Sequence, residues 1–267
     1  DRNATVHVGK ATLTAAAQNA SKAYLAALPN LTYDLTGFVH DENASVLASV
    51  PSITTTATAA SPSGSYPITV SGGSAANYDL TYQNGILVVG KGGQAINFVS
   101  ELNATYGVAP ITLEGNATSG LPVSYASSNP SVAEVNGSKL IIKGAGTALV
   151  TASQGGNANF DPAADRNATV HVGKATLTAA AQNASKAYLA ALPNLTYDLT
   201  GFVHDENASV LASVPSITTT ATAASPSGSY PITVSGGSAA NYDLAYQDGV
   251  LLVGEGVQVI NFVSELN

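Results

Sequence analysis

The chain contains one long internal repeat, because residues 1–80 recur without a single change as residues 165–244. Repetition with a domain-sized period is typical of proteins that place similar folded units in series, whereas a catalytic pocket needs one irregular set of side chains. After residue 80 the copies differ at seven of the next 23 positions. Because protein cores tolerate many apolar substitutions, identity over 80 residues indicates recent duplication and does not mark functional residues.

The sequence predicts an all-β fold of tandem Ig-like β-sandwich modules in an elongated array. Short apolar runs recur every 8 to 12 residues between clusters of Gly, Pro, Asn and Ser, and no window has a helical period with caps. Residues 15–27 form the one stretch that resembles a helix. Asn19 and Ser21 within it, and Pro29 after it, favour two short strands instead.

The composition excludes several classes of partner and site. The net charge is −8 and only nine Lys and Arg residues are present, which argues against nucleic acid as a partner. No run of 18 apolar residues occurs, so we expect no membrane insertion in this segment. The absence of Cys excludes disulfides and thiolate metal sites, and the additional absence of Met suits an exported protein exposed to oxidation.

The first half of each repeat resembles the MBG family, a mostly bacterial module of long surface adhesins. The resemblance rests on an ordered set of short motifs: Lys10-Ala-Thr-Leu-Thr, Lys22-Ala-Tyr, Asn30-Leu-Thr-Tyr, Thr36-Gly-Phe, Gly64-Ser-Tyr-Pro-Ile, Asn77-Tyr and Gly85-Ile-Leu-Val-Val. The usual Tyr-Gly-Asp turn is replaced by Tyr24-Leu25-Ala26. We expect the tyrosines at 33, 66 and 78 to be core residues whose hydroxyls reach the rim.

The second half resembles a bacterial Ig-like (Big) domain. Its motifs are Gln94-Ala-Ile-Asn-Phe, Ala104-Thr-Tyr-Gly, Ser119-Gly-Leu-Pro-Val-Ser-Tyr, Ser127-Ser-Asn-Pro-Ser-Val-Ala, Gly144-Ala-Gly-Thr-Ala and Gln154-Gly-Gly-Asn-Ala-Asn-Phe. Val123 and Tyr125 would share one strand face, a turn would follow, and Val132 would open the next strand. Ala148, Val150 and Ala152 would face the core. We expect Phe98, Tyr106 and Phe160 to fill the ends of that core.

These resemblances predict the domain organisation. The expected parts are residues 1–9, the last strand of a truncated Ig-like module; 10–91, an MBG-like domain; 92–173, an Ig-like sandwich; 174–255, a second MBG-like domain; and 256–267, the first strand of a truncated Ig-like module. Only a few residues separate successive modules, so neighbours should touch. An orphan strand cannot pair its backbone alone. We therefore expect a longer polypeptide, with strand donation between chains as the alternative.

Asparagine glycosylation is the modification that the sequence favours. Seven of the 13 asparagines in residues 1–164 begin an Asn-x-Ser/Thr sequon, more than twice the chance frequency. The eleven candidates are Asn3, Asn19, Asn30, Asn43, Asn103, Asn116, Asn136, Asn167, Asn183, Asn194 and Asn207. N-linked glycans would shield exposed strands. The alternative to glycosylation is that the sequons arise because Asn-rich turns happen to precede Thr-rich strands.

No residue set predicts catalysis, a metal or a cofactor other than N-linked glycans. His7 and His40, with their copies His171 and His204, lack metal-ligand spacing. His40-Asp-Glu-Asn43 is the densest polar cluster, but it lacks the Asp-rich loop of a calcium site. No Gly-x-Ser-x-Gly nucleophile elbow occurs, so we expect no enzyme activity.

The favoured function is structural: an extracellular stalk, sheath or filament on a prokaryotic cell surface. The sequon density favours an archaeal over a bacterial source. Expected partners are neighbouring repeats of the same chain and other copies of the protein in a filament. The alternatives are an adhesin repeat region that binds glycans or another cell, and an accessory region of a secreted enzyme. The absence of Trp, a favoured sugar-stacking side chain, argues against the adhesin.

Overall fold

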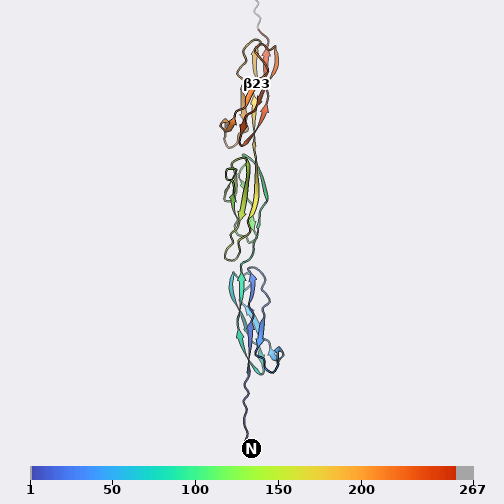
Figure 1. Cartoon of the computed structure of the whole chain (residues 1–267), viewed down its shortest axis with the longest axis vertical. Helices are drawn as coiled ribbons and strands as arrows, with labels where there is room; N and C mark the ends of the chain where they lie inside the picture. Colours follow the sequence, from blue (N-terminus) through green and yellow to red (C-terminus); the bar gives the residue numbers. More distant parts are fainter. Residues whose placement is uncertain (1, 257–267) are drawn as a thin grey trace, which may run out of the picture. The chain divides into compact units, whose positions relative to one another are not determined.

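The computed structural model describes residues 2–256, and these residues confirm the all-β prediction (Figure 1). They form strands, loops and two single-turn 3₁₀ helices, Ala44–Val46 and Ala208–Val210, with no α-helix among them. Within this part of the chain no helix has the length and apolar character needed to cross a membrane. The described residues form two compact units: residues 2–97, 116–123 and 153–165 in the first, and residues 98–115, 124–152 and 166–256 in the second.

The expected modules at residues 10–91, 92–173 and 174–255 are called the first, middle and third modules. Residues 10–91 form two sheets and a short ribbon. Their strands are β1 (Ala11–Ala17), β2 (Ala20–Ala23), β3 (Tyr33–Thr36), β4 (Leu47–Ser49), β5 (Ser52–Thr55), β6 (Gly64–Ser71), β7 (Ser74–Ala75), β8 (Tyr78–Gln83) and β9 (Gly85–Gly90). The sheet orders are β3-β1-β8 and β2-β9-β6-β5, and β4 pairs with β7. Leu13, Leu87 and Ile68 are fully buried. They alternate with polar or exposed neighbours, as half-buried strands require.

The stretch that resembled a helix is two strands, as predicted. β1 and β2 are separated by Gln18 and Asn19, and each strand joins a different sheet. The Asn19 side chain bridges the interruption, because its Oδ1 accepts a hydrogen bond from the Ile86 backbone at 2.7 Å. A polar residue in the middle of an alanine-rich run therefore marks the point where the chain changes sheets.

The middle module (residues 92–173) contributes strands to both units. In the first unit β10 (Ile96–Asn97) pairs with β13 (Asn116–Ala117). The second unit contains the sheets β11-β18-β17-β14 and β12-β16-β15. Their strands are β11 (Glu101–Thr105), β12 (Ile111–Thr112), β14 (Ser124–Ser127), β15 (Ala133–Asn136), β16 (Lys139–Ile142), β17 (Gly146–Ser153) and β18 (Arg166–Gly173).

The middle module's core follows the predicted alternation, with small differences at strand ends. Ala148, Val150 and Ala152 are at most 3% exposed, which confirms their inward orientation. Val132 is buried but precedes β15, and Val123 precedes β14, so only Tyr125 of the expected pair lies in that strand.

The third module (residues 174–255) repeats the first one. Its strands are β19 (Ala175–Ala181), β20 (Ala184–Ala187), β21 (Tyr197–Thr200), β22 (Leu211–Ser213), β23 (Ser216–Thr219), β24 (Gly228–Ser235), β25 (Ser238–Ala239), β26 (Tyr242–Gln247) and β27 (Gly249–Gly254). The sheet orders β21-β19-β26 and β20-β27-β24-β23 match those of the first module. Of the predicted final strand at 256–267, all but Gly256 lies outside the described residues.

Residues 2–9 are extended, exposed and unpaired, although the same sequence forms β18. Val6 and Val8 are 82% and 90% exposed, whereas their copies Val170 and Val172 are 0% and 5% exposed. β18 lies between β11 and β17, so it has a partner on each side.

Candidate functional site: the joints between modules

The second unit contains a joint in which the middle and third modules share one core, here called the Tyr106 joint. Tyr106, Ile142 and Val172 of the middle module belong to the same buried cluster as Ala175 and Tyr242 of the third. Only Lys174 separates β18 from β19, so the two modules are held close enough to exclude water between these side chains.

Glu206 lies at the centre of the Tyr106 joint and accepts hydrogen bonds from both modules. The Tyr106 hydroxyl donates to its Oε1 at 2.8 Å, and the Tyr242 hydroxyl donates to its Oε2. The Tyr106 ring packs edge-on against Tyr242 and His204, with centroid distances of 5.7 and 5.2 Å. The carboxylate is thus bonded through both oxygens, as a partly buried charge requires.

Two further contacts fix the Tyr106 joint. Asn241 Oδ1 of the third module accepts a hydrogen bond from the Ala145 backbone at 2.9 Å. Gly107 has a φ of +96°, and a Cβ placed on it would lie 2.6 Å from Val203. The absence of a side chain at Gly107 therefore allows the backbone of the middle module to approach the third module closely.

Burial and the shared carboxylate change the acid–base behaviour of both tyrosines. Burial, with the hydrogen bond to Glu206 as a smaller cause, raises the pKa of Tyr242 to about 12. The same two causes raise the pKa of Tyr106. In the first module the hydrogen bond to Glu42 is the main cause that raises the pKa of Tyr78. The negative carboxylate favours the neutral, proton-donating phenol in each case.

The first unit contains a different joint, here called the Phe160 joint. Phe160 of the middle module packs edge-on against Tyr24 of the first, with a centroid distance of 5.2 Å and an interplanar angle of 86°. Gly92 forms a β-bridge with Phe160, and its N–H donates to the Asn159 carbonyl at 2.9 Å. The Ser63 N–H donates to Asn159 Oδ1 at 3.0 Å. A Cβ on Gly92 would lie 3.1 Å from the Tyr24 carbonyl oxygen, so this position also requires close backbone approach.

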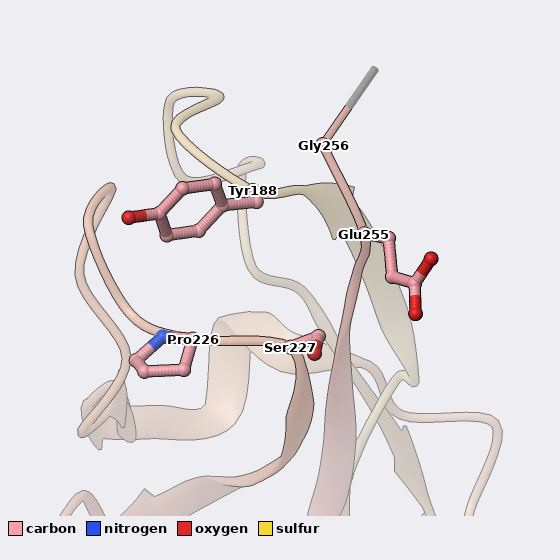
Figure 2. A pocket seen from close by; sticks show the side chains of 5 residues that line it. All are labelled: Tyr188, Pro226, Ser227, Glu255 and Gly256. Carbon is pink, nitrogen blue, oxygen red and sulfur yellow. The ribbon is translucent and has the colours of Figure 1, made fainter. Parts of the chain in front are cut away.

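The third module carries a copy of the surface that receives Phe160. A hollow of about 290 Å³ is lined by Tyr188, Pro226, Ser227, Glu255 and Gly256 (Figure 2). Their equivalents in the first module are Tyr24, Pro62, Ser63, Lys91 and Gly92. Figure 2 shows the Tyr188 ring above Pro226, with the Glu255 side chain pointing away. In the first unit, Tyr24, Ser63 and Gly92 contact the 159–160 segment. Three residues that line the hollow, Tyr188, Ser227 and Gly256, are therefore equivalents of residues that contact Asn159 or Phe160.

The sequence prediction for the aromatic residues is partly corrected by these joints. Tyr78 is 2% exposed, as expected of a core residue, whereas Tyr33 and Tyr66 are half-buried. Tyr106 packs against Tyr242 and Phe160 packs against Tyr24, so both rings contact residues of neighbouring modules. These rings therefore connect modules. A ring at the end of a small core buries additional apolar area when it packs against the neighbouring module.

The unusual Tyr24-Leu25-Ala26 turn retains the conformation that glycine would favour. Leu25 has a φ of +64°, and its copy Leu189 has the same value. Lys22 supports this turn from below: it is only 9% exposed, and its Nζ donates to the carbonyl oxygens of Ala23, Ala26 and Ala59 at 3.2, 3.1 and 3.0 Å. Three backbone carbonyl oxygens, rather than a carboxylate, thus accept the hydrogen bonds of the buried ammonium group.

All eleven sequon asparagines are exposed. By contrast, the half-buried asparagines at 129, 159 and 241 begin no sequon, and Asn159 and Asn241 bind backbone groups at the joints. Asn43 and Asn207 cap the two 3₁₀ helices through Oδ1, and Asn19 and Asn183 use Oδ1 at the sheet change. Since a glycan would attach to Nδ2, these acceptor roles are compatible with modification.

The polar segment at His40 and its copy at His204 has a structural role. Glu42 and Glu206 accept hydrogen bonds from Tyr78 and Tyr242, and His204 packs on Tyr106. His7 and His171 are exposed. Within residues 2–256 no group of three or more His, Asp and Glu side chains is placed to hold a metal ion. The sequence identified this cluster as unusual, but it did not indicate that a tyrosine from another module would bind there.

Comparison with known proteins identifies the modules. The MBG domain (YGX type) family matches residues 13–88 and 177–252, and the immunoglobulin-like domain of intimin matches residues 111–156. These are repeat and adhesion-type domain families and not enzyme families. No curated protein is significantly similar to the chain.

Among solved structures, the chain is similar to cadherin fragments. Drosophila N-cadherin EC1–4 has 7% identity and a TM-score of 0.30, with 92% of this chain and 76% of that chain covered. Mouse protocadherin-24 EC1–3 has 10% identity and a TM-score of 0.27, with 94% and 92% covered. The family matches, in contrast, span more than half of the sequence and agree with the resemblance of the motifs. The chain belongs to the MBG domain (YGX type) family, with an intimin-type Ig-like domain between its two MBG domains.

Proposed function

We propose that this protein is a structural extracellular repeat protein that forms a stalk, sheath or filament on a prokaryotic, and by preference archaeal, cell surface. Its activity is to hold a position at a distance from the cell, and its partners are neighbouring repeats and other copies of itself. We propose that residues 10–91, 92–173 and 174–255 are the modules that are repeated.

The observation that carries this proposal is the construction of the joints. At the Tyr106 joint two modules share one buried cluster, with Glu206 bonded to a tyrosine from each. At the Phe160 joint, side-chain and backbone contacts hold the Asn159–Phe160 segment against the first module. Domains that are connected only by a flexible linker bury little surface against each other. The third module has a copy of the Phe160-binding surface, which is consistent with repeated modules.

Electron microscopy of the native surface material tests this proposal. We expect filaments or sheets in which beads follow one another at about 30–45 Å, because strands of about 8–10 residues rise about 3.3 Å per residue and a short joint is added. Dispersed single chains in the native material, with no repeating bead, would contradict the structural role.

We further propose that the eleven exposed sequons carry N-linked glycans. The exposure of all eleven sequon asparagines supports this assignment. Glycopeptide mass spectrometry of native material should find added glycan mass on the eleven sequon asparagines and none on Asn129, Asn159 or Asn241. Unmodified asparagines at all eleven positions would contradict the proposed glycosylation and the argument for an archaeal source that depends on it.

An adhesin is the alternative, and one surface favours it. In the third module Val250 and Leu252 are 44% and 53% exposed, beside a hollow of about 580 Å³ that Asn183 and Ser229 also line. The first module has Ile86 and Val88 at these positions, so the exposed side chains changed between copies but remained apolar. Exposed apolar surface of this kind is typical of association sites. Binding of the unglycosylated chain to a glycan array or to whole cells, abolished by Leu252→Ser, would favour adhesion.

A further inference from the structure

In every module, a strand near the beginning of the module runs parallel to a strand near its end. In the first module β1 pairs with β8 from Ala11↔Tyr78 to Ala16↔Gln83, and β2 pairs with β9 from Ala20↔Leu87 to Ala23↔Gly90. The third module repeats both pairings. In the middle module β11 pairs with β18 from Glu101↔Thr169 to Thr105↔Gly173.

The two pairings of the first module form one continuous ladder. Both have the same sequence offset of 67, and the hydrogen bond from Ile86 to Asn19 Oδ1 has this offset too. The ladder begins with the bond from Ala11 to the Asn77 carbonyl at 3.0 Å and ends with the bond from Tyr24 to the Gly90 carbonyl at 2.8 Å. The Asn19 side chain thus replaces the backbone bond that is lost where the strands change sheets.

Parallel pairing determines how tension acts on such a ladder. The chain enters at one end of the first strand and leaves at the opposite end of the last strand, so a pull on the two termini of a module slides these strands past each other. Because the hydrogen bonds of a parallel pair are evenly spaced along the strands, they resist this shear together. A pull on two points at the same end of the ladder would instead break the bonds one after another.

We infer that each module is a shear-loaded clamp and that the protein bears tension along its chain. This inference rests on the proposed function as a stalk or filament, and it adds that the three parallel ladders are the force-bearing elements. Resistance to forced unfolding is set by the barrier to unfolding and not by equilibrium stability. A protein held under load would therefore gain more from these ladders than from a larger core.

The absence of cysteine allows the force to be applied at chosen positions of the full chain. Lys10→Cys with Lys91→Cys places the attachment points at opposite ends of the first module's ladder. Lys10→Cys with Asn77→Cys places both points at the same end and serves as the matched control. In single-molecule pulling at one loading rate, we expect the first pair to need more than about twofold the force of the second, because many evenly spaced bonds must break together.

A side-chain variant tests the continuity of the ladder. Asn19→Ala should lower the unfolding force for the pair at 10 and 91 and have little effect on the pair at 10 and 77. The equivalent Asn183→Ala in the third module should leave the first module's force unchanged, which shows that the effect is confined to the module that carries the substitution. The unglycosylated chain is used, since Asn19 begins a sequon.

The outcomes separate this inference from the proposed function. Equal unfolding forces for the two attachment geometries would overturn the inference that the ladders bear force. They would not affect the proposed stalk function, because electron microscopy tests that function. A large difference between the geometries, together with native material that contains only dispersed chains, would retain the clamp as a property of the fold and overturn the stalk.

Discussion

The Tyr106 hydroxyl donates a hydrogen bond to Glu206 Oε1 at 2.8 Å, and this bond joins an Ig-like domain to the MBG domain that follows it. The first MBG domain contains the same arrangement without the incoming tyrosine, because Tyr78 bonds to Glu42 and Phe38 packs on Tyr78 at 5.9 Å. In the third module the Phe202–Tyr242 distance is 6.0 Å. The internal contacts of the surface that receives Tyr106 are therefore the same in both MBG domains.

Tyr106→Phe should weaken the Tyr106 joint. Hydrogen bonds to charged groups contribute about 1.5–3 kcal/mol, so we expect a loss of this size in the unfolding free energy of the third module. Hydrogen exchange of third-module peptides measures the loss. Glu206→Gln should be coupled to Tyr106→Phe in a double-mutant cycle, whereas the matched Glu42→Gln should show no coupling. Simple additivity of the first two changes would contradict the assigned bond.

Tyr24→Ala and Tyr188→Ala compare the filled and open copies of one surface. Tyr24 packs against Phe160, whereas Tyr188 is 41% exposed. An edge-to-face pair contributes about 0.5–1.5 kcal/mol beyond its buried area. We therefore expect Tyr24→Ala to cost about 1–2 kcal/mol more than Tyr188→Ala, measured as urea unfolding of the full chain. Phe160→Ala should reproduce the Tyr24 effect, and equal costs at 24 and 188 would show that the Phe160 joint contributes no stability.

Leu25→Gly should stabilise the first MBG domain. Leu25 is 55% exposed and has a φ of +64°, a conformation that costs an L-residue about 1–2 kcal/mol. After the entropy cost of glycine is subtracted, we expect a gain of about 0.5–1 kcal/mol. Leu25→Ala keeps the unfavourable φ and should give no gain, so it is the control. Thermal unfolding by circular dichroism distinguishes the two, and a loss of stability in Leu25→Gly would mean that the Leu25 side chain contributes contacts beyond its exposed surface.

The sequence predicted most of the fold, because period-two patterns and turn residues act locally. Ala148, Val150 and Ala152 face inward as their alternation indicates, and Asn19 divides an alanine-rich run into two strands. The joints could not be predicted in the same way. Glu206 and Tyr106 are 100 residues apart, and no local pattern relates them.

The Phe160 joint could not be predicted from a local pattern either. Phe160 was expected at the end of a core, but only the structure places Tyr24 against it. The missing information is tertiary in each case, since it concerns which surface lies beside the segment.

High pH should loosen the Tyr106 joint. The pKa of Tyr242 is about 12 in the folded protein, above the ordinary value of 10.0, so folding favours the protonated phenol. Its contribution to stability is complete below pH 10 and is lost as the pH rises towards 12, because the unfolded state releases its proton first. Hydrogen exchange corrected for its intrinsic pH dependence should show protection of residues 202–206 falling across this interval. Tyr242→Phe has no ionisable hydroxyl and should lose less protection between pH 10 and 12, although it starts from a weaker joint. An identical pH profile in the two proteins would mean that Tyr242 ionisation does not control the joint.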